Sequence, residues 1–213
     1  VDGDIAPHKK YFYAVQEYPD ALVVTVDDDV VYDENLVETL YEGHLANPQA
    51  IICQRANLAM FRPDGTLRSY DGWVYDCNYL RGKASYQLLP TGIGGVLYPP
   101  HSLPAATFDL EAITETALYA DDLWLKAMAT ANGYPVWMPR ERAGYQQIQE
   151  AQTVALWRRN AFQGNNDLVL EKVFGHLEHG VGVSRDALLQ RIRGVADDGR
   201  VIGPDDVDTA PLI

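Results

Sequence analysis

The chain has little cysteine, few histidines and no long apolar run, and each shortage excludes a class of protein. Two cysteines among 213 residues, Cys53 and Cys77, do not make a disulfide framework, so we expect free thiols in a reducing compartment. No apolar stretch approaches the length needed to span a bilayer, and no stretch has the pattern of a signal peptide. The five histidines are scattered, and their spacing does not predict a zinc site.

Basic residues are also scarce, because 17 lysines and arginines face 30 aspartates and glutamates, which gives a net charge of −13. This charge excludes a general basic surface for nucleic acid, but it leaves room for a small anion held by a metal ion and a few local cations. The 47% of hydrophobic residues is typical of a globular protein with its own core. We expect one domain over residues 1–200 and a loose polar tail over residues 201–213.

The chain does have a group of acids at the end of an apolar run. Residues 22–26 are mainly β-branched and predict a strand buried on both faces. Asp27, Asp28 and Asp29 follow directly, and three like charges there repel one another and lose hydration. Mg²⁺ or Mn²⁺, which takes one or two carboxylates together with phosphate oxygens, would offset both costs. The simpler alternative is a turn in which one aspartate, with Asp33 best placed, caps the next helix.

The remaining pattern alternates helices and strands and predicts an α/β sheet of mixed direction flanked by helices. In the helix over residues 34–47, the expected inward positions are Leu36, Val37, Leu40, Tyr41 and Leu45. We expect further helices over residues 7–18, 110–119, 123–132, 145–160, 167–176 and 184–194, strands over residues 50–55 and 136–139, and a hairpin over residues 58–70.

Two loops carry candidate binding residues. Residues 70–90 hold Trp73 and four tyrosines, which either pack on the core or form a wall that stacks on a sugar. Residues 91–100 (TGIGGVLYPP) place three glycines before an apolar strand, where glycine permits unusual backbone angles and the close approach of a ligand. The glycine spacing matches neither a P-loop nor a dinucleotide fingerprint.

Asp121 and Asp122 form a second acid pair at the start of a predicted helix. One aspartate there would cap the helix and interact with its dipole. A second one beside Trp124 implies a partly desolvated setting, which raises the pKa of a carboxylate toward that of a general base. Lys9 and Lys10, near the start of the first helix, are either solvated surface lysines or reach a phosphate near the acids.

In this order, the segments resemble those of GT-A-type glycosyltransferases, in particular bacterial enzymes of capsule, lipopolysaccharide and cell-wall glycan synthesis. The resemblance extends over residues 4–167 and is carried by DIAPHKKYFYAVQEYPDALVVTVDDDVVY, LLPTGIGGVLYPP, YADDLWLKAMA and, more weakly, LWRRNAFQGNND. Residues 1–21 are too few for the βαβαβ nucleotide-binding unit that such enzymes carry before this strand. The resemblance therefore implies either a fragment of a larger enzyme or a shortened GT-A fold.

The resemblance implies a metal-dependent, inverting enzyme that moves a sugar from a nucleotide-diphosphate donor to a saccharide hydroxyl. It also implies a cytoplasmic protein, either free or peripheral to the inner face of the membrane. It assigns the divalent metal (Mn²⁺ or Mg²⁺) to Asp29 and Asp27, the catalytic role to Asp122 as base with Asp121 beside it, and the donor to Asp27, Asp28, Lys9, Lys10, Gly94 and Gly95. Trp73 and Trp124 are the candidate acceptor-side residues.

Two other functions fit the acid triplet. Asp27-Asp28-Asp29-Val30-Val31 also resembles the opening motif of haloacid-dehalogenase-like Mg²⁺-dependent phosphatases, in which Asp27 would be the nucleophile and Asp29 the acid/base. That family places its further acids after another strand of a parallel sheet, whereas Asp121 follows a predicted helix. The third possibility is a non-catalytic module that binds carbohydrate or Ca²⁺, or a truncated remnant that binds partners only.

Overall fold

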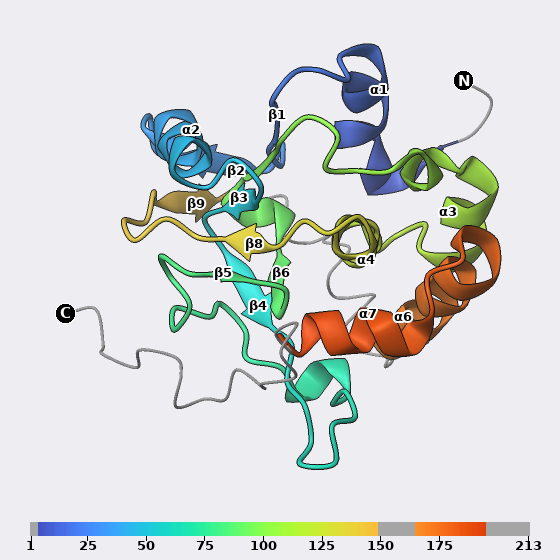
Figure 1. Ribbon diagram of the computed structural model, residues 1–213. Helices are drawn as coiled ribbons and strands as arrows, with labels where there is room; N and C mark the ends of the chain where they lie inside the picture. The colour runs from blue at the N-terminus through green and yellow to red at the C-terminus, as the bar shows by residue number, and fades with distance from the viewer. Residues whose placement is uncertain (1–3, 149–164, 195–213) are drawn as a thin grey trace.

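The fold is a mixed five-stranded sheet flanked by helices, seen in the computed structural model, which describes residues 4–148 and 165–194 (Figure 1). The β3–β8 pair is parallel, and the other three pairs of this sheet are antiparallel. The predicted α/β class with strands of mixed direction is therefore confirmed. The strands, in spatial order, are β1 (Val23–Thr25), β7 (Val96–Tyr98), β3 (Ile51–Cys53), β8 (Val136–Trp137) and β5 (Ala84–Ser85).

Two short antiparallel pairs lie beside the main sheet. β2 (Val30–Tyr32) pairs with β9 (Tyr145–Gln147), and this pairing holds the far end of the aspartate turn that follows β1. β4 (Ala56–Leu58) pairs with β6 (Leu88–Pro90) and brings the chain after β3 next to the glycine segment before β7.

Helices cover both faces of the sheet because its central strands alternate side chains between two hydrophobic clusters. Ile52 and Leu97 face α2, whereas Ile51 and Val96 face the larger cluster that includes α4, α6 and α7 (Figure 1). The helices are α1 (Lys9–Glu17), α2 (Leu36–Ala46), α3 (Leu110–Thr116), α4 (Asp121–Ala131), α6 (Asn165–His176) and α7 (Arg185–Ile192), with 3₁₀ turns η1 (Ala6–His8), η2 (Tyr70–Gly72), η3 (Gly92–Gly94) and η4 (Ala105–Phe108) and the π-turn η6 (Leu177–Val181).

Helix α4 is the most deeply buried helix among these, and it sits between the sheet and the C-terminal helices. It contacts β6, α6 and α7, and Trp124 and Met128 are fully buried on it. Within residues 4–148 and 165–194, no helix is both long enough and apolar enough to cross a membrane.

Several local predictions are confirmed. The helices expected over residues 123–132 and 167–176 form as α4 and α6, and Gly133, at φ +84°, ends the first of them. Ser184 caps α7, because its hydroxyl accepts a hydrogen bond from the amide of Ala187 at 3.2 Å. Cys53 and Cys77 are free, buried thiols.

The region around β1 and α2 differs from prediction. β1 lies at the edge of the sheet and ends at Thr25, so Val26 is 45% exposed. Asp33 caps no helix, because its carboxylate accepts a hydrogen bond from the amide of Gly144 at 2.7 Å. Helix α2 buries only a narrow stripe, and three positions predicted to face inward are exposed, namely Val37, Tyr41 and Leu45.

The helix predicted over residues 145–160 is wrong at its start. Tyr145–Gln147 is strand β9, paired with β2, because the tertiary pairing decides the conformation of this short polar segment. Residues 149–160 of that prediction, like the predicted tail at residues 201–213, lie outside the described residues.

Lys126 of α4 is a buried cation in the main core. Its Nζ has no hydrogen-bond partner within the described part of the chain and lies 5.9 Å from the centre of the Tyr86 ring. Burial lowers the pKa of Lys126 to about 7. The unfolded chain therefore binds this proton more tightly between about pH 7 and pH 10.5, so the contribution of Lys126 to stability rises with pH through that window.

Lys126→Met should stabilise the protein at pH 7 by roughly 1–3 kcal/mol, because it removes a buried, unpaired polar group at nearly constant volume. The gain should shrink at pH 10. Urea unfolding at both pH values measures it, with Lys172→Met on the exposed face of α6 as the control. A loss of stability at pH 7 would contradict the assignment of Lys126 as a buried, uncompensated cation.

Candidate functional site

Four charged side chains from three separate segments meet beyond the end of β1. Lys10 comes from α1, Asp27 from the turn after β1, and Asp121 and Asp122 from the first turn of α4. The Nζ of Lys10 lies 3.1 Å from Oδ1 of Asp27 and 2.8 Å from Oδ2 of Asp121. We call these four residues the acid cluster. The structure thus brings together the first acid motif, the second acid pair and one of the two predicted lysines.

The glycine turn η3 packs directly on the acid cluster. The amide of Gly92 donates to the carboxylate of Asp122, 3.2 Å from Oδ1. A Cβ atom at this position would collide with Nζ of Lys10 and lie 3.0 Å from Oδ1 of Asp27. A side chain at position 92 would therefore displace the Lys10 ammonium from its place between the two acid motifs.

Gly92 was missed by sequence reasoning, which selected Gly94 and Gly95 instead. Gly94 packs on Arg55, where an added Cβ would lie 2.6 Å from the arginine Cβ. Gly95 packs on Leu36 and has a φ of +78°, so it serves the turn into β7. The sequence signal was the closeness of three glycines, but it did not say which of them touches the acids.

Burial and charge set the protonation of the acid cluster. The pKa of Asp122 is raised to about 7, by burial first and by the negative charge of Asp121 second, against the opposing charge of Lys10. Burial alone would lower the pKa of Lys10, but the charges of the three aspartates outweigh burial and hold that pKa well above its usual range. Lys10 thus stays positive, while the pKa of Asp122 lies near neutral pH. The raised pKa agrees with the partly desolvated setting that the neighbouring Trp124 predicted.

Two buried side chains fix the helix that carries Lys10. Nε2 of His8 lies 2.9 Å from the carbonyl oxygen of Ala117, and Nδ1 lies 2.7 Å from the hydroxyl of Tyr11. A carbonyl only accepts, so Nε2 carries the proton and Nδ1 accepts from Tyr11. Burial lowers the pKa of His8, which keeps this ring neutral and the arrangement intact.

The aspartate turn is held at both ends while its middle is free. The amide of Asp27 donates to the hydroxyl of Tyr32 at 3.0 Å, and the amide of Ile148 donates to the carbonyl of Asp29 at 3.0 Å. In the described part of the chain, neither the carboxylate of Asp28 nor that of Asp29 has a hydrogen-bond or ion-pair partner. Asp28 is exposed and Asp29 is half-buried.

The donors on this turn suit a loosely held divalent cation. Across residues 4–148 and 165–194, no group of three or more His, Cys, Asp or Glu side chains is arranged to hold a metal ion. Asp27 and Asp29 still offer carboxylate oxygens, the ligands that Mg²⁺ and Mn²⁺ prefer, and these ions need only one or two carboxylates when a phosphate completes their shell. The described residues thus form no closed protein cage, and a divalent ion at this turn would need phosphate or water oxygens to complete its shell.

Three predicted site residues take no part in the acid cluster. Trp124 is fully buried, and its Nε1 donates to the carbonyl of Thr107 at 3.0 Å, so it offers no face to a sugar. Trp73 is also buried, and its Nε1 donates to the carbonyl of Arg68 at 3.1 Å. Lys9 pairs with Asp4 at 2.6 Å on the exposed surface.

Lys10→Met should raise the pKa of Asp122 by about one pH unit, because it removes the positive charge that favours the carboxylate. The ¹³C shift of the Asp122 carboxyl followed by NMR between pH 4 and pH 9 measures this. Lys10→Arg keeps the charge and Lys9→Met removes a neighbouring exposed charge, so both should titrate as the wild type does. An unchanged pKa in Lys10→Met would show that the lysine does not control Asp122.

Comparisons with known proteins add no family to this geometry. The chain matches no model of a protein family, and comparisons with curated proteins and with solved structures give no match either. The function proposed below therefore depends on the geometry of the acid cluster and on the order of the motifs along the chain.

Proposed function

We propose that this protein is a metal-dependent glycosyltransferase of the GT-A type, which moves a sugar from a nucleotide-diphosphate donor to a saccharide hydroxyl. The meeting of Asp27 with the Asp121–Asp122 pair around Lys10 carries the proposal. These residues and Gly92 come from three segments that are far apart in sequence. The same three segments carry the resemblance to the family. The resemblance adds cell-surface glycan synthesis on the cytoplasmic side as the expected setting.

Asp122 would be the general base of an inverting single displacement. Its carboxylate takes the proton of the acceptor hydroxyl as that oxygen bonds to the anomeric carbon, and the bond from that carbon to the diphosphate oxygen breaks. A base is most effective when its pKa lies near the working pH, and the pKa of Asp122 is raised to about 7. The amide of Gly92 orients this carboxylate.

Lys10 and the aspartate turn would serve the donor. Lys10 holds a fixed positive charge between the two acid motifs, close to where the leaving diphosphate gains negative charge. A divalent ion held by Asp29 and Asp27, with Asp28 beside them, would neutralise charge on that diphosphate when bound. Asp29 is the freer ligand, because Asp27 is already paired with Lys10.

The phosphatase alternative is less well supported by the topology. Such enzymes place the nucleophilic aspartate and the later acids after strands of one parallel sheet. In this protein β1 is an edge strand antiparallel to β7, and Asp121 and Asp122 open a helix that follows α3. The non-catalytic alternative differs from ours in predicting binding without turnover.

Asp122→Asn should lower sugar transfer by about 10²–10⁴-fold, because the amide cannot accept the proton. Binding of the donor nucleotide should stay near that of the wild type. Release of nucleoside diphosphate from a panel of nucleotide sugars, with mixed saccharide acceptors, measures turnover. The control is Asp186→Asn, which occupies the same second position of its helix but is exposed. Transfer at the wild-type rate by Asp122→Asn would remove the base assignment.

Asp29→Ala should abolish the part of nucleotide binding that requires a divalent ion. Calorimetry with nucleoside diphosphates, in the presence and absence of Mn²⁺, separates this part from the rest. Asp20→Ala, an exposed aspartate ahead of β1, should bind as the wild type does. Equal Mn²⁺ dependence in Asp29→Ala and wild type would exclude Asp29 as a ligand.

A further inference from the structure

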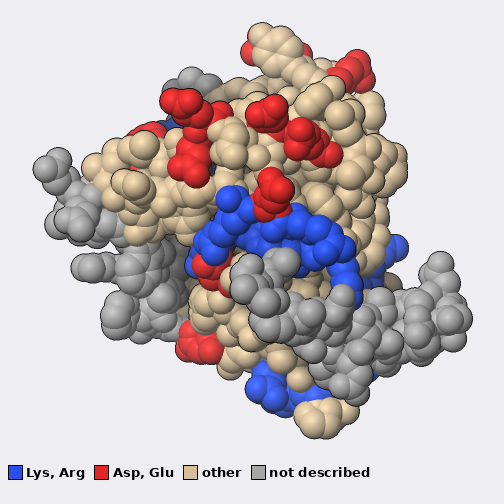
Figure 2. All heavy atoms as spheres, turned by 90° about the vertical axis from the view of Figure 1, so that its left-hand side faces the viewer, with Lys and Arg blue, Asp and Glu red and all other residues tan. Residues whose placement is uncertain are grey.

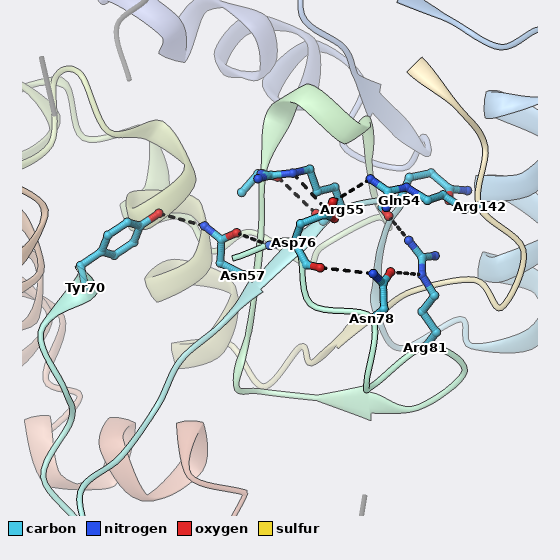
Figure 3. Close-up of polar contacts among 9 residues, drawn as sticks. Gln54, Arg55, Asn57, Tyr70, Asp76, Asn78, Arg81 and Arg142 are labelled. Carbon is cyan, nitrogen blue, oxygen red and sulfur yellow. Dashed lines mark hydrogen bonds and ion pairs between the residues drawn. The ribbon is translucent and has the colours of Figure 1, made fainter. Parts of the chain in front are cut away.

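Two arginines, Arg55 and Arg142, flank the single carboxylate of Asp76, and a third, Arg81, lies nearby (Figure 3). Arg55 packs on one end of the glycine turn, whose other end contacts the acid cluster. Nη2 of Arg142, from the β8–β9 connection, lies 3.0 Å from Oδ2 of Asp76. Nε of Arg55, after β3, lies 3.8 Å from Oδ1 of the same residue. Burial lowers the pKa of Arg81, and the positive charge of the nearby Arg142 lowers it further. A local excess of positive charge is unexpected in a chain of net charge −13.

The arginines differ in how far the protein already uses their donors. Arg81 is buried and donates to the carbonyls of Gln54 and Pro139 at 2.6 and 2.8 Å, so it joins the ends of β3 and β8. Among the residues that the structure describes, Arg142 donates only to Asp76, and its guanidinium lies 5.9 Å from the Tyr145 ring. Each guanidinium carries five N–H donors, so most donors of Arg142 have no partner within residues 4–148 and 165–194.

Arg55 also has donors without a partner in the described part of the chain. Its Nη1 donates to the hydroxyl of Thr91 at 2.7 Å, whereas the 3.8 Å to Asp76 is longer than a hydrogen bond. The side chain of Arg55 is 20% exposed and those of Asp76 and Arg142 are 37% exposed, so solvent reaches the group. Figure 2 shows Lys and Arg side chains gathered in one patch on the face that carries the β8–β9 connection.

Asp76 has a left-handed backbone conformation. Its φ is +49°, a region that glycine, asparagine and aspartate adopt more readily than other residues. Its amide donates to Oδ1 of the buried Asn57 at 3.1 Å, which fixes the residue beneath the two arginines. Its Oδ1 is buried and has no hydrogen-bond partner within the described residues. The Asp76 carboxylate thus lies between two guanidinium groups, but it accepts a hydrogen bond from Arg142 alone of the two.

The arginine group and the acid cluster flank one short turn. Gly92 touches Asp27 and Lys10, and Gly94, at the other end of η3, packs on Arg55. The acid cluster and the arginine group therefore lie at the two ends of one three-residue turn.

We propose that Arg55 and Arg142 form an anion-binding subsite for a phosphate or carboxylate group of a ligand, and that the carboxylate of Asp76 competes with that group for the two guanidiniums. Arginine is suited to both anions because its planar fork pairs with two oxygens at once. The two sources are a nucleotide phosphate and an acidic sugar such as a uronate. The subsite goes beyond the proposed transfer reaction and stands without it, since anion binding requires neither a donor sugar nor a metal ion.

The test is calorimetry of the full chain, without divalent ions, with inorganic pyrophosphate, with glucuronate and with neutral glucose. Asp76→Asn should tighten binding of one of the two anions about tenfold, because it removes the internal competitor. Asparagine tolerates positive φ, so the turn should persist. Arg142→Gln, on an exposed side chain, should weaken binding of the same anion about tenfold. The anion that responds identifies the source.

The Arg185–Glu171 pair on α7 and α6 supplies the matched controls. Glu171→Gln and Arg185→Gln break an ion pair of the same kind elsewhere and should leave anion binding unchanged. The proposal is overturned if Asp76→Asn binds neither anion more tightly than the wild type, or if Arg142→Gln binds as the wild type does. It is also overturned if Glu171→Gln gives the same gain as Asp76→Asn.

Discussion

The arrangement of the candidate site depends on the ammonium group of Lys10, which lies between Asp27 and Asp121. Without a cation there, aspartates from two distant segments would repel one another in a partly buried place. With Lys10 present, two of the acids are compensated and Asp122 remains beside them with a pKa raised to about 7. The same contact therefore holds the segments together and leaves one carboxylate ready to take up a proton.

The fold supplies this contact through its connections more than through its strands. The turn after β1, the glycine turn before β7 and the start of α4 are all segments where regular structure begins or ends. Gly92 lets the glycine turn lie close to Lys10 and Asp27 because it has no side chain, and its amide donates to Asp122. The pairing of β4 with β6 sets Arg55 against the other end of the glycine turn, so a negative and a positive group flank the same backbone.

Local sequence pattern was enough to predict the elements that carry the site. A strand forms before Asp27, although it lies at the sheet edge and ends at Thr25, and the acid pair opens an apolar helix, because hydrophobic pattern acts over a few residues. The desolvation of Asp122 also followed from its neighbours. Strand β9 could not be predicted, since Tyr145–Gln147 is polar and extended only through its pairing with β2.

Long-range packing decides the rest, and no local pattern reveals it. The sequence predicts Trp124 as an acceptor-side residue, whereas its position on α4 buries it fully in the core. Arg55, Asp76 and Arg142 are unexceptional in sequence and become a group only when three loops meet. Gly92 could be selected among three glycines only once its neighbours in space were known.

The most direct measurement is anomalous diffraction at the manganese edge, from crystals of the protein grown with Mn²⁺ and a nucleotide sugar. We predict one anomalous peak at coordination distance from a carboxylate oxygen of Asp29 or Asp27, with the diphosphate on its far side and Asp122 facing the sugar. A diphosphate bound elsewhere, or aspartates that contact only Lys10 and backbone amides with no manganese near them, would contradict the proposed function.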